Sequence, residues 1–144
     1  MDKLKNRIND LLFDYTKINF CEDKDIAKLI KTSPANISRW KNGISLPSIE
    51  NLIKLTKLFD CSIDYVCGRT ENIGKFKPLK IKDFSTNLQN VLHTKHITKY
   101  KLFKDLKLTK GHENTWFTNK KNPSTINYIK IADYLNISLE ELID

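Results

Sequence analysis

Apolar residues recur at intervals of three and four along the first fifteen residues of the chain, at Leu4, Ile8, Leu11, Leu12 and Tyr15. This spacing places one apolar stripe along a helix. Four more short apolar groups of helical spacing follow, at Ile26-Ala27-Ile30, Ile37-Trp40, Ile49-Leu52-Ile53-Leu55-Leu58 and Ile63-Tyr65-Val66. Strand-like alternation is almost absent, so the pattern predicts an all-α fold with five helices in this half.

Helix start and stop signals separate these groups. Ser33 followed by Pro34 predicts a helix start, because Ser accepts a bond from a free amide and Pro fits the first turn. Asn42-Gly43 predicts its end, since Gly adopts the left-handed conformation that closes a helix. Ile37 and Trp40, three residues apart, point inward, so the residues between them face outward.

The same outline returns seventy-six residues later. The matching landmarks are Trp40 with Trp116, Pro47-Ser48 with Pro123-Ser124, Asn51 with Asn127, Ile53-Lys54 with Ile129-Lys130, and Ser62 with Ser138. With 144 residues, the repeat predicts two small domains of about 65 residues each. We expect domains at residues 1–68 and 83–144, joined by a basic linker at residues 69–82.

The chain carries a formal charge of +8 and a sequence pI near 9.3. An acidic partner follows from this, with nucleic acid ahead of an anionic membrane or an acidic protein. No run approaches the about 20 apolar residues that span a bilayer, so we expect no membrane contact. The charge therefore favours nucleic acid as the partner, and the alternative is a basic surface that only keeps the protein soluble.

Candidate metal and redox chemistry is weak in this sequence. Cys21, Cys61 and Cys67 lack regular spacing and sit where the helices need small apolar residues, and the three histidines lack zinc-site spacing. No signal-peptide pattern precedes them, so we expect a reduced cytoplasmic protein. No nucleophile, base and orienting group are signalled together, and no Gly-rich phosphate loop is present. We expect no enzyme activity, no metal and no cofactor.

The segment DIAKLIKTSPANISRWKNG, followed by Pro47-Ser48 and CSIDYV, resembles the Cro and lambda-repressor family of helix-turn-helix regulators, also called the XRE family. The resemblance covers roughly residues 4 to 68, and it implies two tandem five-helix lambda-repressor-like domains, the second one degenerate. In this family the third helix lies in the major groove and reads base edges. The chain is thus expected to bind DNA as a transcriptional regulator.

The resemblance also implies which residues contact DNA. Base-reading residues would be Pro34, Ala35, Asn36 and Arg39. Arg39 is the strongest candidate, because a guanidinium pairs bidentately with guanine O6 and N7. Phosphate contacts would come from Ser33, Lys41 and Asn42.

The first domain departs from the family pattern at two places. Glu22 and Asp23 lie at the start of the second helix, where they would repel phosphates. The turn position commonly held by Gly is Lys31, which must then adopt the left-handed conformation at a cost of about 1 to 2 kcal/mol.

The second domain is less regular. Glu113 matches inward-facing Ile37, so either its helix is rotated or frayed, or the carboxylate meets Lys107 or His112. Donors nevertheless remain near the outward face and in the following loop. Candidate second-domain DNA contacts are Lys110, His112, Asn114, Thr115, Lys120 and Lys121.

Two arrangements on DNA stay open. In one, both domains of a monomer bind, because a linker of about 15 residues extends up to about 50 Å, more than the about 34 Å between successive major grooves. In the other, the first domain reads DNA and the second pairs with its copy, giving a homodimer on a palindrome. We favour the homodimer, because one small module rarely gives useful specificity.

These observations predict a sequence-specific repressor of phage or mobile-element type. The alternative is a protein-binding inhibitor or antitoxin-like interaction protein built from helix-turn-helix modules, with or without repression of its own promoter. Its contact surface would include the acidic start of the second helix together with Ile44 and Leu46. In that case the second domain is a further candidate site for a protein partner.

Overall fold

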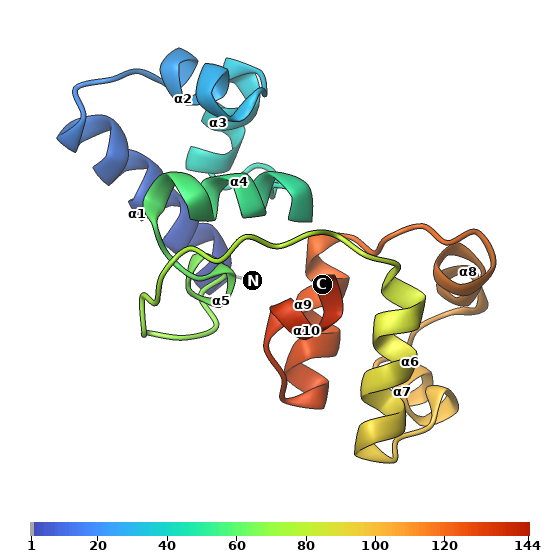
Figure 1. The fold of residues 1–144 in the computed structure, drawn as a ribbon. Helices are drawn as coiled ribbons and strands as arrows, with labels where there is room; N and C mark the ends of the chain where they lie inside the picture. Colours follow the sequence, from blue (N-terminus) through green and yellow to red (C-terminus); the bar gives the residue numbers. More distant parts are fainter. Residues whose placement is uncertain (1) are drawn as a thin grey trace. The chain divides into compact units, whose positions relative to one another are not determined.

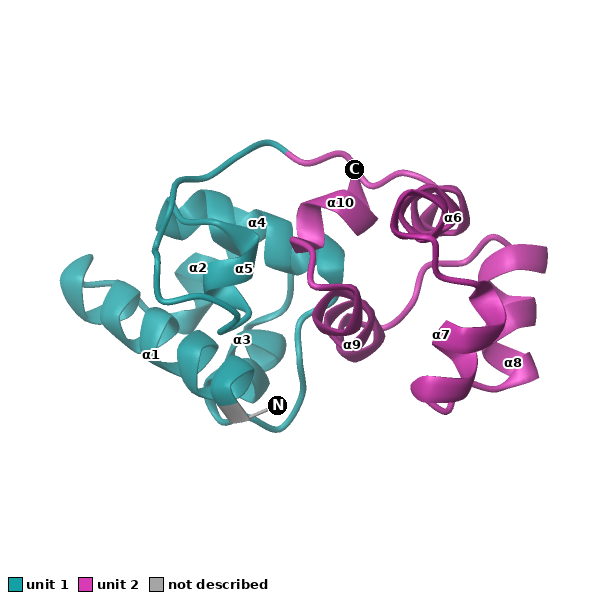
Figure 2. Cartoon of the chain, turned by 90° about the horizontal axis from the view of Figure 1, so that it is seen from below, with its two compact units in different colours: residues 1–78 teal, residues 79–144 magenta. Residues whose placement is uncertain are grey.

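The computed structural model describes residues 2–144. Within this range the chain forms ten α-helices and one π-helical turn, with no β-strand (Figure 1). The prediction of an all-α fold is confirmed. The chain divides into two compact units, Met1–Pro78 and Leu79–Asp144 (Figure 2).

The first unit contains the five helices that the apolar pattern predicts. They are α1 (Asp2–Ile18), α2 (Asp23–Ile30), α3 (Pro34–Lys41), α4 (Ile49–Phe59) and α5 (Ile63–Val66). Serine begins three of them: the side chains of Ser33, Ser48 and Ser62 each accept a hydrogen bond from the backbone amide three residues later. Side-chain capping of this kind satisfies one of the amides that have no partner inside the helix.

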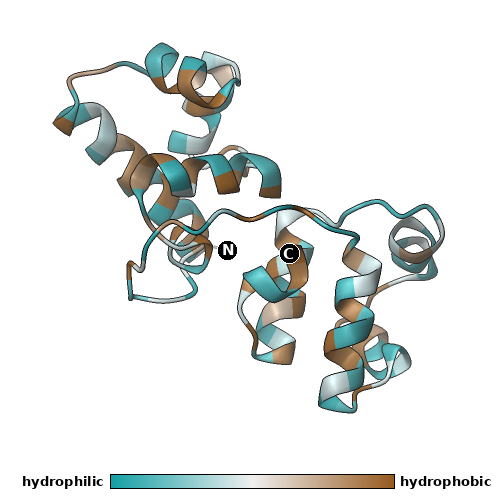
Figure 3. Cartoon of the chain, viewed as in Figure 1, coloured by the Kyte–Doolittle hydropathy of each residue, from teal (hydrophilic) through white to brown (hydrophobic). Residues whose placement is uncertain are grey.

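The core of the first unit consists of the predicted inward-facing residues. Leu4, Ile8 and Leu12 of α1 are at most 2% exposed, and Ile37 and Trp40 of α3 are 0% and 4% exposed. Figure 3 shows hydrophobic and hydrophilic residues alternating along the helices. Cys61 and Cys67 are buried in the same core and form no disulfide within residues 2–144, which agrees with their expected role as small apolar residues.

The second unit repeats this order with α6 (Phe84–Lys95), α7 (Lys99–Asp105), α8 (Lys110–Glu113), η1 (Asn114–Thr118), α9 (Thr125–Leu135) and α10 (Leu139–Ile143). Its core is built around aromatic rings. Phe84 packs edge to face against Trp116 and Tyr128, with ring centroids 5.3 and 5.1 Å apart. Such edge-to-face pairs add stability beyond the area they bury.

The opening helices of the two units differ in length. The buried residues Leu4, Ile8 and Leu12 correspond to Phe84, Leu88 and Leu92, an interval of eighty residues instead of seventy-six. The first unit therefore has four more residues before its second helix, and α1 has 17 residues where α6 has 12. The extension ends in exposed apolar residues: Ile18 is 72% and Phe20 is 95% exposed.

The segment between α5 and α6 has no helix or strand, but both of its ends are hydrogen-bonded to the unit they adjoin. Ser62 N donates to Ile73 O and Phe76 N donates to Asp60 Oδ1. On the other side, Lys80 N donates to Asp144 Oδ2. Only the three residues 77–79 lie between these two attachments.

Candidate nucleic-acid interface

The turn between α2 and α3 sets the position of the candidate reading helix. Lys31 closes α2 in the left-handed region, with φ 57° and ψ 54°, as predicted. Thr32 N then donates to Ala27 O at 2.8 Å, and Asn36 Nδ2 donates to Thr32 Oγ1 at 2.9 Å. These bonds join the end of α2 to the first turn of α3.

Helix α3 is fixed at both ends and along its inner face. Ser33 Oγ accepts from Asn36 N at 3.2 Å at the start. At the end, Gly43 adopts φ 68° and Ile44 N donates back to Arg39 O at 2.9 Å. Ile37 and Trp40 are buried between these ends, whereas Pro34, Ala35 and Arg39 are exposed.

The four predicted base-reading residues lie along this helix, with Asn36 half-buried and the other three exposed. Pro34 and Ala35 form the first turn. The Arg39 guanidinium makes no hydrogen bond or ion pair with any described residue. It is therefore free to meet a base edge, whereas the Asn36 amide group already donates one bond to Thr32.

The three predicted phosphate contacts differ in their availability. Ser33 is exposed, and its hydroxyl proton remains free while the oxygen caps α3. Asn42 Nδ2 donates to Ser38 O at 2.9 Å. Lys41 Nζ lies 2.8 Å from Asp23 Oδ1 and 4.4 Å from the ring centre of Phe13, and its side chain is only 13% exposed. A phosphate contact by Lys41 would therefore require exchange of this ion pair.

The start of α2 is acidic. Glu22 N donates to Asp25 Oδ2 at 2.8 Å, which caps the helix. Negative charge at a helix start stabilises the helix through its dipole, but it opposes a nearby phosphate. In the second unit, Thr98, Lys99 and Lys101 take the places of Glu22, Asp23 and Asp25, and Thr98 caps α7.

The helix that matches α3 has a different form in the second unit. Here α8 has four residues and continues into the five-residue π-helical turn η1. Lys121 N donates to Thr115 O, six residues back, where Ile44 N in the first unit donates to Arg39 O, five residues back. The wider turn takes up one extra residue, and the loop before Pro123 is one residue shorter. The seventy-six-residue interval is thereby restored.

The altered helix relieves the charge problem at Glu113. Its carboxylate lies 3.0 Å from Lys99 Nζ, and its side chain is 40% exposed. The prediction of Lys107 or His112 as the partner is wrong, because the carboxylate forms its ion pair with Lys99 of α7 instead. The exposure of Glu113 removes the cost of burying a charge at the position that Ile37 fills in the first unit.

The candidate DNA contacts of the second unit are in different states. Lys110 and Lys121 are exposed and make no ion pair among residues 2–144. His112 Nδ1 accepts from Thr109 N at 3.0 Å, and Thr115 Oγ1 donates to Gly111 O at 2.8 Å. Lys120 Nζ lies 2.9 Å from Ser85 Oγ and 3.7 Å from Asp83 Oδ2.

Asn114, the last of these candidate contacts, is an exposed residue of η1. Its backbone carbonyl oxygen accepts from Asn119 N at 2.8 Å, a bond that helps to close the π-helical turn. Asn114 therefore belongs to a π-helical turn and not to a regular α-helix.

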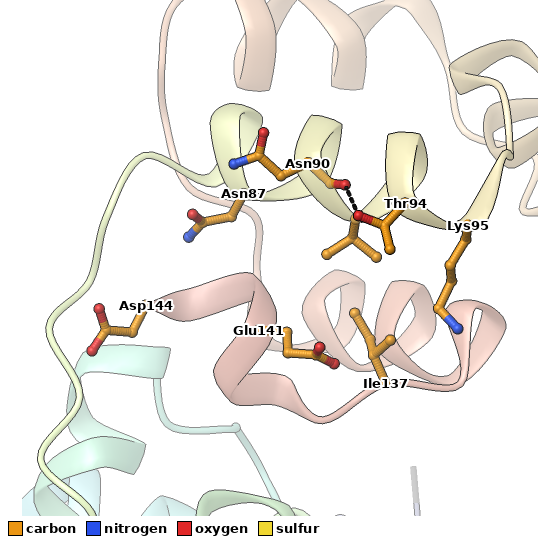
Figure 4. A pocket seen from close by; sticks show the side chains of 8 residues that line it. Asn87, Asn90, Thr94, Lys95, Ile137, Glu141 and Asp144 are labelled. Carbon is orange, nitrogen blue, oxygen red and sulfur yellow. Dashed lines mark hydrogen bonds between the residues drawn. The ribbon is translucent and has the colours of Figure 1, made fainter.

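A second kind of site would need a pocket with reactive groups. A pocket of about 310 Å³ lies between α6 and α10, with Asn87, Asn90, Lys95 and Glu141 among its lining residues (Figure 4). The Thr94 hydroxyl in its wall donates to Asn90 O at 3.0 Å. Among the described residues no group of three His, Cys, Asp or Glu side chains is placed to hold a metal ion.

Three features of the site were not predicted from the sequence. The first is the Lys41–Asp23 ion pair, which joins residues eighteen positions apart. The second is the contact of the Lys41 ammonium with the ring of Phe13, which belongs to a third helix, α1. The π-helical turn had one signal: Gly43 closes α3, whereas its counterpart Asn119 is not a glycine. The left-handed residue in the second unit is Lys120, one position later.

Comparison with protein families matches both units. Residues 23–66 match the family model described as helix-turn-helix, and residues 87–144 match the model described as Cro/C1-type HTH DNA-binding domain. Searches of curated proteins and of solved structures gave no match. No helix within residues 2–144 is long and apolar enough to cross a membrane.

Proposed function

The chain belongs to the Cro/C1-type helix-turn-helix family and carries two of its modules in tandem, and from this premise we propose that it recognises a specific double-stranded DNA sequence through α3. In helix-turn-helix proteins the second helix of the motif lies in the major groove with its N-terminal residues at base edges. Here that helix begins at Pro34.

The single observation that carries this proposal is the state of Arg39. The residue is exposed, its guanidinium is unpaired within the described chain, and its helix is fixed by Ile37 and Trp40 in the core. A free guanidinium on a rigid helix can pair with both O6 and N7 of one guanine, which contributes about 1 to 3 kcal/mol of discrimination. We propose that Asn36, Ala35 and Pro34 complete the base contacts.

Phosphate contacts would then orient the helix. The Ser33 hydroxyl and the Asn42 amide lie at the two ends of α3, where a backbone-contacting group fixes position without reading sequence. We propose that Lys41 joins them after releasing Asp23. This exchange makes the Lys41 contact weaker than that of an unpaired lysine.

We propose that two chains bind a palindromic site, each with one α3 in the major groove. One helix contacts only a few base pairs, and typical specific affinities need more contacts than one small module makes. The dimer also agrees with the loss of a regular reading helix in the second unit, where α8 has four residues. Such a protein acts where DNA is, so we propose a cytoplasmic location.

Selection of bound duplexes from a random pool by the full chain tests this function. The proposal predicts enrichment of a palindrome whose half-sites lie about one helical turn, or a multiple of it, apart. Two unlike half-sites would contradict the homodimer and favour a monomer that reads with both units. Recovery of no common sequence would contradict sequence-specific binding.

We propose repression as the direction of regulation, in a protein of phage or mobile-element type. A dimer that occupies a promoter excludes other proteins from the same DNA and needs no further contact to act. A reporter gene placed behind the selected site should be expressed less when the chain is present. Increased expression would contradict the proposal and indicate an activator.

One observation favours a second candidate function, the binding of a protein by the first unit. Ile44, directly after α3, is 73% exposed, and Glu22 and Asp25 give the nearby start of α2 exposed acidic groups. A protein-binding inhibitor or antitoxin-like protein would use such a mixed surface. DNA binding weakens steeply as salt rises, because phosphate contacts release counterions. A partner whose affinity is insensitive to salt would favour this second function.

A further inference from the structure

The two helix-turn-helix segments differ in charge. Residues 22–45 of the first unit contain five basic and three acidic residues, a formal charge of +2. The matching residues 98–121 contain seven basic and two acidic residues, a formal charge of +5. The larger charge lies in the unit whose reading helix is the less regular one.

The base-facing positions of the second unit are poorly equipped to read bases. Pro34, Ala35, Asn36 and Arg39 correspond to Lys110, Gly111, His112 and Thr115. Glycine offers no side chain at all. The His112 ring is bonded to Thr109 N, and the Thr115 hydroxyl is bonded to Gly111 O.

The π-helical turn is a further difference between α3 and its counterpart in the second unit. In the first unit one eight-residue helix carries all four base-facing positions. In the second unit Lys110, Gly111 and His112 lie on the four-residue α8, whereas Thr115 lies in η1. Base recognition by hydrogen bonds depends on the relative direction of such side chains. The second unit has therefore lost the arrangement that the first unit keeps.

Its unpaired positive charge is nevertheless concentrated in the same segment. Three of its lysines are neutralised: Lys99 by Glu113, Lys101 by Asp105 and Lys120 by Asp83. Four exposed lysines make no ion pair or side-chain hydrogen bond within residues 2–144: Lys104, Lys107, Lys110 and Lys121.

The first three of these lysines recur every third residue through the turn of the motif. Lys104 lies in the last turn of α7, Lys107 in the turn with φ 55°, and Lys110 begins α8. Lysine ammonium groups bind phosphate as point charges and need no fixed orientation. These lysines are therefore suited to binding the DNA backbone and not to reading a base.

We propose that the second unit binds DNA phosphates without sequence preference, through these four lysines, and adds affinity to a site that α3 of the first unit selects. This inference rests on the proposed function, because it assumes that the first unit reads DNA. On this proposal, sequence recognition depends on Arg39 of the first unit, and the salt-dependent part of the affinity depends on the second unit.

The test is a full-chain variant in which all four lysines are replaced by glutamine. The matched control loses four equally exposed and unpaired lysines outside both helix-turn-helix segments: Lys17, Lys57, Lys95 and Lys130. Both variants lose the same net charge. Binding is measured to the selected duplex and to an unrelated duplex over a range of salt concentrations, and thermal unfolding confirms that each variant folds.

The proposal predicts that the test variant binds both duplexes about tenfold or more weakly at low salt, with the ratio of the two affinities unchanged. The slope of log affinity against log salt should fall by about 0.9 for each lost phosphate contact, and by clearly more than in the control. If the variant fails to fold, the double variant Lys110→Gln with Lys121→Gln, outside α7, should show about half the effect.

Two outcomes would overturn the inference. A change in the ratio of affinities would mean that the second unit reads sequence. Equal slopes in the test and control variants would remove this unit from the DNA and leave an acidic protein as the ligand of the lysines. Failure of the proposed function itself looks different, because the wild-type chain would then bind the two duplexes equally.

Discussion

Lys41 and Asp23 form an ion pair that joins the end of α3 to the start of α2, with 2.8 Å between Nζ and Oδ1. On the proposed interface, this pair occupies a lysine that we propose as a phosphate contact, and the Asp23 carboxylate repels phosphate. In Asp23→Asn we expect tighter DNA binding by several fold at low salt, and a salt slope steeper by about 0.9, as for one added phosphate contact. Fluorescence anisotropy over a salt series measures both quantities.

The matched change is Asp14→Asn on the exposed face of α1, which also removes one negative charge. It should raise affinity much less, because it frees no lysine near α3. The loss of stability in Asp23→Asn should stay near 1 kcal/mol, the usual scale of a partly exposed pair. Equal affinity gains in the two variants would show that only net charge matters.

Ile37 supports α3 from the core, where it is 0% exposed. Ile37→Ala should lower the free energy of unfolding by about 2 to 5 kcal/mol, because it leaves a cavity. Ile44→Ala removes the same atoms from a side chain that is 73% exposed and should change stability by about 0.5 kcal/mol at most. Urea unfolding followed by circular dichroism compares them, and similar losses would contradict the assigned core.

Tyr128 carries a buried hydroxyl that has no hydrogen-bond partner among residues 2–144. Burial raises the pKa of this phenol well above its ordinary value, in keeping with the apolar surroundings. Tyr128→Phe should therefore stabilise the second unit by about 1 kcal/mol, since an unsatisfied buried group is removed and the edge-to-face contact with Phe84 remains. A lower melting temperature in this variant would show that the hydroxyl has a partner.

Burial raises the pKa of the Cys61 thiol to about 11, and the nearby Asp60 carboxylate adds to the shift. The folded state favours the protonated thiol. Its stabilising contribution is therefore complete below the unfolded pKa of about 8.5 and is lost as pH rises toward 11. Between pH 7.5 and pH 10, the free energy of unfolding should fall less in Cys61→Ala than in Cys21→Ala, because the second variant keeps the Cys61 thiol. An equal fall in both would contradict this assignment.

Much of the fold follows from local signals. Ser33, Ser48 and Ser62 each cap a helix start, and the apolar stripe of α1 gives the core positions Leu4, Ile8 and Leu12. These features need only neighbouring residues, so a sequence pattern is enough to predict them. The family matches confirm the tandem of two helix-turn-helix modules that the repeat predicts.

The features that escaped prediction depend on residues far apart in the chain. Lys99 of α7 pairs with Glu113 of α8, fourteen positions later in the chain, and no spacing rule indicates that pair. The hydrogen bonds that the segment between α5 and α6 makes are another case. Asp60 and Asp144 accept hydrogen bonds from the backbone amides of Phe76 and Lys80, which lie sixteen and sixty-four positions away from them. The assignment of base and phosphate contacts stays a prediction.

The central claim is that Arg39 reads one guanine from a rigid α3. The most direct measurement is the affinity of the wild type, Arg39→Ala and Arg39→Lys for the selected duplex and for variants changed at one base pair each. We predict that the wild type loses about 1 to 3 kcal/mol at one guanine and that both variants bind this altered duplex and the selected one equally. Arg39→Lys should keep the wild-type salt slope. Unchanged discrimination at every position in Arg39→Ala would contradict the account.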